Sequence, residues 1–125
     1  MNVNKPLLPF AEAERRVESL LKSQGHRILA RNFAIHNLGE IDIISLRNGV
    51  IFATEVKARQ HENHDFGAET KFIRTKQRRI INTLYAYSAK QGQFDRPLAL
   101  LAAEVFWDRQ HTISKLVVRP WESGV

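Results

Sequence analysis

LGEIDIISLRNGVIFATEVKAR, residues 38–59, contains two apolar segments that enclose charged side chains. Asp42 lies among isoleucines, and Glu55 and Lys57 alternate with alanine and valine. Asn48-Gly49 between the two segments is a strong signal for a tight hairpin turn. We therefore expect antiparallel strands over residues 39–45 and 50–58. Burying a charge is costly unless the charge is paired or binds a metal, so these three residues require an explanation.

The alternation of side chains along a strand predicts which charged groups meet. Glu40 and Asp42 share one face of the first strand, and Glu55 and Lys57 share one face of the second. Because converging carboxylates repel, a divalent cation such as Mg²⁺ or Mn²⁺ would stabilise them. A lysine beside such a site can hold a water molecule or offset charge on a phosphate. A solvent-exposed hairpin is the competing interpretation, and the apolar residues on both faces argue against it.

The remaining segments predict a single α/β domain over residues 1–125. Periodicity and turn residues predict two helices, five strands and a polar surface loop over residues 59–70. The helices are expected at residues 10–24 and 70–90, and the strands at residues 26–35, 39–45, 50–58, 98–107 and 112–118. This order is typical of a central mixed sheet of about five strands flanked by two main helices.

The composition indicates a soluble protein that binds a polyanion. The chain has 19 Lys and Arg against 13 Asp and Glu, a net charge of +6 and a pI near 10.1. Nucleic acid is the favoured partner, with an acidic membrane surface as the weaker alternative. The absence of cysteine excludes disulfides. No apolar run is long enough for a signal peptide or a membrane span, so a cytoplasmic location is expected.

Each predicted helix carries one polar residue within its apolar stripe. Glu14 lies between Phe10 and Val17 at helical spacing, and Gln77 lies between Ile73 and Ile80. Both are therefore expected to point toward the sheet that carries the acids. A border position on the helix would explain either residue alone, so the convergence of the two is the stronger argument.

The second helix also carries a cluster of basic residues that predicts phosphate contacts. Its members are Lys71, Arg74, Lys76, Arg78 and Arg79. A solvated helix face is the alternative. His61 and His64 are a weak candidate for a metal pair, because zinc sites need further ligands. Trp107 and Trp121 could stack on bases, although packing in the core or at an edge is favoured.

Taken with their spacing, the charged residues resemble the D…(E)xK nuclease motif of the restriction-endonuclease-like superfamily. More closely, the chain resembles the bacterial YraN-type family, regarded as endonucleases related to archaeal Holliday junction resolvases. The resemblance covers about residues 10–87 and rests on GHRILARNF, GEIDIIS, IFATEVKAR, Phe66-Gly67 and KQRRI.

The resemblance implies a role for each matching residue. Asp42, Glu55 and the Val56 carbonyl would bind the metal, and Lys57 would be the catalytic lysine. Glu14 would complete or orient the metal shell, and Gln77 would support the site or contact the phosphate. Two positions depart from the family: Ala13 replaces a glycine, and residues 98–107, LALLAAEVFW, lack an Arg-Phe-Asp tripeptide. Either that tripeptide is dispensable, or activity is altered.

These observations favour a metal-dependent endonuclease that hydrolyses phosphodiester bonds in DNA, including branched or otherwise structured DNA. DNA is favoured over RNA as the substrate, and cutting two strands symmetrically would favour a homodimer. A binding module that keeps the fold with reduced catalysis is the alternative. A subunit that uses the basic helix against an acidic protein is a third.

Overall fold

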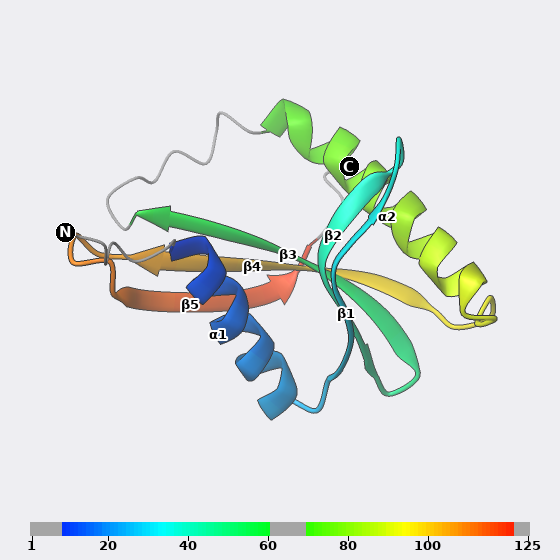
Figure 1. Ribbon diagram of the computed structural model, residues 1–125, viewed down its shortest axis with the longest axis horizontal. Helices are drawn as coiled ribbons and strands as arrows, with labels where there is room; N and C mark the ends of the chain where they lie inside the picture. The colour runs from blue at the N-terminus through cyan, green and yellow to red at the C-terminus, as the bar shows by residue number, and fades with distance from the viewer. Residues whose placement is uncertain (1–8, 61–69, 122–125) are drawn as a thin grey trace.

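Five strands and two helices form the part of the chain that the computed structural model describes, residues 9–60 and 70–121 (Figure 1). The sheet has the strand order β1-β2-β3-β4-β5. The elements are α1 Pro9–Ser23, β1 Arg27–Ile35, β2 Gly39–Arg47, β3 Val50–Gln60, α2 Thr70–Lys90, β4 Leu98–Trp107 and β5 Ile113–Pro120. Every predicted helix and strand is present, so the predicted α/β architecture is confirmed.

The sheet is mixed. β1, β2 and β3 form an antiparallel meander, α2 connects β3 to the parallel strand β4, and β5 returns antiparallel to β4 at the edge. The turn between β2 and β3 has positive φ at both central residues, 51° at Asn48 and 79° at Gly49. These angles match the right-handed twist of a hairpin, which is why the Asn-Gly pair predicted this turn.

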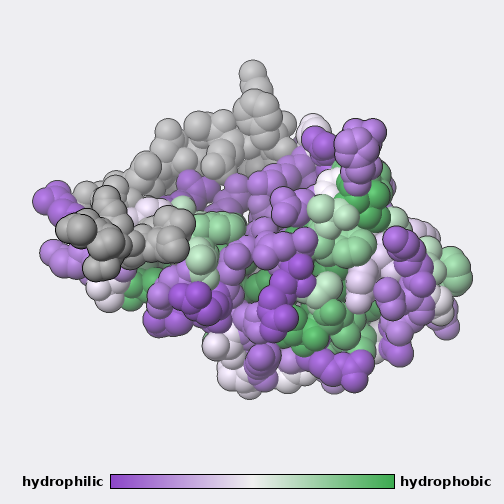
Figure 2. All heavy atoms as spheres, viewed as in Figure 1, coloured by the Kyte–Doolittle hydropathy of each residue, from purple (hydrophilic) through white to green (hydrophobic). Residues whose placement is uncertain are grey.

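α1 covers one face of the sheet and α2 covers the other. The α1 layer buries Ala13, Val17 and Leu21 against residues of β2, β3 and β4. α1 ends where Gly25 adopts a φ of 93°, and the His26 amide donates to the Leu21 carbonyl at 3.0 Å. This hydrogen bond is characteristic of a glycine-terminated helix. In Figure 2, hydrophilic residues line the outer side of α1, beside hydrophobic residues over β1.

α2 packs closely on β2 at the position of Gly39. The α2 layer buries Ile80, Leu84 and Tyr87 against β2 and β3 residues. A Cβ atom added to Gly39 would lie 2.7 Å from the Thr83 hydroxyl oxygen. Since real side chains do not approach so closely, glycine at this position sets how near α2 lies to the strand that carries Asp42.

The β1–β2 hairpin is kinked at its centre. Asn32 has a φ of 48° inside β1, a conformation that asparagine tolerates better than most residues. On opposite sides of this kink, Ile43 packs in the α1 layer and Ile41 packs in the α2 layer, although the two are two residues apart on β2. The described pairing of β2 with β3 also ends here, at Ile43 and Thr54. The two strands therefore separate at Asp42.

Candidate metal and nucleic-acid site

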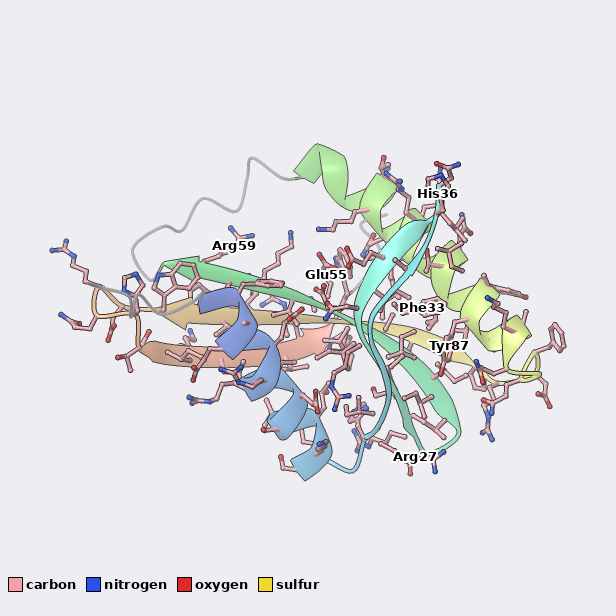
Figure 3. All side chains as sticks on the ribbon, in the orientation of Figure 1. Arg27, Phe33, His36, Glu55, Arg59 and Tyr87 are labelled. Carbon is pink, nitrogen blue, oxygen red and sulfur yellow. The ribbon has the colours of Figure 1, made fainter. Side chains whose placement is uncertain are left out.

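The separation of β2 from β3 opens a cleft of about 990 Å³ that α2 borders on one side. Asp42 and Glu55 both line this cleft, so the hairpin brings the two predicted metal-binding carboxylates to one site. In Figure 3, Glu55 lies near the middle of the molecule, where β2 diverges from β3, and Arg59 lies farther along β3. The charged or polar residues of the lining are Asn32, Asn37, Glu40, Asp42, Glu55, Lys57, Arg59, Lys76 and Arg79.

Asp42 is held in place by the main chain of β3. The Val56 amide donates a hydrogen bond of 2.8 Å to Asp42 Oδ2. The pKa of Asp42 is raised to about 7, chiefly by burial and also by the nearby charges of Glu55 and Glu14, against the lowering effects of the Val56 amide and Lys76. A carboxylate in such surroundings is stabilised by an added positive charge.

Glu55 is the buried partner of a lysine on α2. Its side chain is 9% exposed, and its Oε2 lies 2.5 Å from Nζ of Lys76, whose side chain is 48% exposed. The partner of Glu55 is therefore a residue that the sequence predicted to contact phosphate. This ion pair joins β3 to α2 across the cleft.

Glu14 lies on the other side of Asp42. Together with Asp42 it lines a smaller cavity of about 220 Å³ between α1 and β1. Glu14 Oε2 is buried and has no hydrogen-bond partner among residues 9–60 and 70–121. Burial raises the pKa of Glu14, and the charge of Glu40 raises it further. Glu14 thus approaches the site from behind Asp42, outside the main cleft.

The donor atoms fit a hard divalent cation bound by few protein ligands. Within the described ranges, no group of three or more Asp, Glu or His side chains is close enough to hold one ion. Asp42 and Glu55 supply carboxylate oxygens, and Val56, whose carbonyl was the third predicted ligand, also lines the cleft. Mg²⁺ commonly binds through one or two carboxylates and keeps several waters, so an ion in this cleft would use Asp42 and Glu55 and would not require Glu14 as a direct ligand.

The basic residues of α2 divide between the cleft and the outer surface. Lys76 and Arg79 line the cleft, and Arg79 Nε donates to the Leu38 carbonyl at 3.3 Å. Arg74 and Arg78 are exposed and are not part of its lining. Three other residues with predicted roles have side chains outside the described part of the structure: Lys71, His61 and His64.

The other predicted positions have different surroundings. Gln77 is buried on the sheet side of α2, as its place in the apolar stripe predicts, and it does not line the cleft. Trp107 contributes to the lining of the cleft, whereas Trp121 packs against the α2 layer. Lys57 lines the cleft on β3, two residues beyond Glu55.

Glu104 on β4 is a buried acid that the sequence reasoning missed. It is 7% exposed, it lies beside Lys57 in the parallel register of β3 and β4, and it pairs with Arg119 at 2.7 Å. The signal was the one used for Asp42, since Ala103 and Val105 flank this single acid within an apolar strand. The strand that lacks the Arg-Phe-Asp tripeptide therefore still carries a buried acid next to the lysine.

Comparison with known proteins identifies the family of the chain. The model of a family described as "Uncharacterised protein family UPF0102" matches residues 13–98. The chain belongs to family UPF0102. This is the YraN family, so the resemblance seen in the sequence is confirmed. Membership of this family suggests a nuclease-like function.

UPF0102 relatives cover varying shares of the chain. A UPF0102 protein of Clostridium novyi is 42% identical over 87 residues, 69% of this chain and 68% of the relative. One from Lachnoclostridium phytofermentans is 43% identical over 74 residues, 59% of this chain and 61% of the relative. One from Acetivibrio thermocellus is 33% identical over 109 residues, 87% of this chain and 83% of the relative.

The chain was also compared with solved structures, and its described helices were compared with the requirements of a membrane span. An XisH family protein from Nostoc punctiforme aligns with a TM-score of 0.44 and 19% identity, covering 84% of this chain and 98% of that protein. Neither described helix of the UPF0102 chain combines the length and apolarity that crossing a bilayer requires.

Proposed function

We propose that this UPF0102 protein is a Mg²⁺- or Mn²⁺-dependent endonuclease that hydrolyses phosphodiester bonds in DNA. The observation that carries the proposal is the meeting of Asp42 and Glu55 in one cleft, with Lys57 on the same strand as Glu55. Two buried or half-buried carboxylates beside lysine match the needs of phosphodiester hydrolysis better than those of a structural hairpin. The orphaned oxygen of Glu14 next to Asp42 adds a further polar group to this region.

The proposed roles follow from the position of each side chain. Asp42, Glu55 and the Val56 carbonyl would hold the ion, which when bound supplies Lewis-acid activation of water and phosphate. The Val56 amide orients Asp42 by its hydrogen bond. The Lys57 ammonium would stabilise the negative charge that develops on the phosphate. Glu14 would help to complete or orient the metal shell from the smaller cavity, where it lies next to Asp42.

The basic groups of the cleft provide the proposed contact with DNA. Lys76 and Arg79 of α2 border the same space as Lys57 and Arg59 of β3. Cations on two walls of one cleft can contact phosphates on either side of a scissile bond. The net charge of +6 favours the approach of any nucleic acid. Phosphate contacts of this kind do not select a sequence, so structure-specific rather than sequence-specific cleavage is the expected behaviour.

A non-catalytic DNA-binding module is the second candidate, and the Glu55–Lys76 ion pair favours it. The pair neutralises the buried carboxylate without a metal. In such a module the cleft would bind phosphate through Arg79 and Lys57, and Mn²⁺ would have no effect on stability.

The test is a cleavage panel with the purified full chain. Fluorescent branched, flapped, single-stranded and duplex DNA, with an RNA control, are incubated with Mg²⁺, Mn²⁺ or EDTA. The nuclease proposal predicts cleavage of at least one DNA substrate that EDTA abolishes and that Lys57→Met reduces by about 100-fold or more. Metal-independent DNA binding with no cleavage of any substrate would support the binding module instead.

A further inference from the structure

Lys76 supplies the positive charge that the buried Glu55 carboxylate requires. Its ammonium is 2.5 Å from Glu55 Oε2, and the Glu55 side chain is 9% exposed. A buried carboxylate requires a positive partner, because an unpaired charge away from water is costly. A divalent ion bound to Glu55 in the same cleft would supply the same compensation. The lysine and the metal are therefore alternative partners for one group.

We propose that Lys76 is an exchangeable counterion that pairs with Glu55 in the metal-free protein and moves to a DNA phosphate when a divalent ion takes its place. This inference rests on the proposed function, and it adds a mechanism that links metal binding to DNA binding. Lys76 is a positioning and binding residue in this account, distinct from Lys57.

The surroundings of Lys76 permit such an exchange. Its side chain is 48% exposed, and it lines the same cleft as Lys57 and Arg79. A lysine side chain has a flexible four-carbon stem that can redirect its charge by rotamer changes alone. Glu55, in contrast, is on a central strand and is buried, so the lysine is the mobile member of the pair. Arg79 is tethered differently, through the Leu38 carbonyl of the segment that precedes β2.

The exchange should lower the affinity for metal in the absence of DNA and raise the affinity for DNA once the metal is bound. Before DNA arrives, Lys76 competes with the metal and weakens its binding to Glu55. Once the metal is bound, the released ammonium adds one cation to the cleft and strengthens the attraction for phosphate. Because coupling between two ligands is reciprocal, DNA should then tighten metal binding as much as metal tightens DNA binding.

Isothermal titration of Mn²⁺ into the DNA-free protein tests the first consequence. Lys76→Gln should bind Mn²⁺ about tenfold more tightly than the wild type, within the usual range of site coupling. Lys76→Arg keeps the charge and should bind Mn²⁺ no more tightly than the wild type. Lys90→Gln is the matched control, since it removes the same charge from the exposed last turn of α2, and its Mn²⁺ affinity should be unchanged. Urea unfolding of each variant verifies that the fold is intact.

Binding of a short duplex in Ca²⁺ or in EDTA, over a range of salt concentrations, tests the second consequence. In wild-type protein, Ca²⁺ should steepen the slope of log affinity against log salt by about one unit more than in Lys76→Gln, because one more ammonium reaches a phosphate. Equal Mn²⁺ affinities and equal slopes in wild type and Lys76→Gln would overturn the counterion exchange while leaving the nuclease proposal intact. Failure of every variant to bind Mn²⁺ would overturn both.

Discussion

Asp42→Asn should stabilise the metal-free protein, and by an amount that grows with pH. Asp42 has its pKa raised from 3.8 to about 7, chiefly by burial. A raised pKa means that the fold favours the protonated acid, so this contribution to stability is complete below pH 3.8 and is lost as pH rises through 7. Asparagine keeps the acceptor for the Val56 amide and carries no charge at any pH.

The magnitude follows from the size of the shift. At about 1.4 kcal/mol per unit, the ionised carboxylate would cost the fold at most about 4 kcal/mol above pH 7. Asp42 lines an open cleft, so water screens part of this cost, and about 1–2 kcal/mol is the expected gain for Asp42→Asn at pH 8. Near pH 4 the two proteins should differ little.

Urea unfolding of both proteins in EDTA, from pH 4 to pH 8.5, measures this difference. Asp95→Asn makes the same change at an exposed aspartate and should show no gain that depends on pH. Adding Mn²⁺ at pH 8 should stabilise the wild type and not Asp42→Asn, by about 2.7 kcal/mol at a concentration of 100 times Kd. A constant difference between wild type and Asp42→Asn across the pH range would refute the reasoning.

Three further changes test the architecture around the cleft. Gly39→Ala should cost about 1–3 kcal/mol of unfolding free energy, because the added methyl group meets the Thr83 hydroxyl; urea unfolding measures it, and no loss would contradict the close packing. Asn32→Val should cost about 1–2 kcal/mol in the left-handed conformation, whereas Asn32→Gly should be nearly neutral, and equal stabilities would contradict the kink. Arg79→Gln should lower the slope of log DNA affinity against log salt by about one unit, and Arg74→Gln, the matched change outside the cleft, should lower it less. A larger effect of Arg74→Gln would mean that the phosphates bind outside the cleft.

The sequence predicted the strands well because their signals are local. The Asn48-Gly49 turn and the alternation of charged with apolar residues determine the hairpin register, and that register brings Asp42 and Glu55 to one cleft. Gly25 ends α1 for an equally local reason, its positive φ. Glu104 carries the same kind of local signal, since it is a single acid within an apolar strand.

Features that depend on distant segments could not be predicted in this way. The basic residues of α2 were expected to act as one face, but the helix orientation brings Lys76 and Arg79 into the lining of the cleft and leaves Arg78 outside it. That orientation follows from the buried stripe of α2 and from how closely the helix approaches Gly39. The ion pair between Lys76 and Glu55 likewise requires the positions of both α2 and β3.

The central claim is that the Asp42–Glu55 cleft hydrolyses DNA, and Glu55→Gln tests it most directly. Single-turnover cleavage of the best substrate in Mn²⁺ is measured for wild type and Glu55→Gln, together with DNA binding in EDTA. We expect cleavage to fall by at least about 100-fold, because glutamine keeps the size of the side chain and removes the charge that the ion requires. DNA binding in EDTA should be kept or strengthened, since a negative charge facing phosphate is lost. Equal cleavage by wild type and Glu55→Gln, or no cleavage by the wild type of any substrate, would contradict the account.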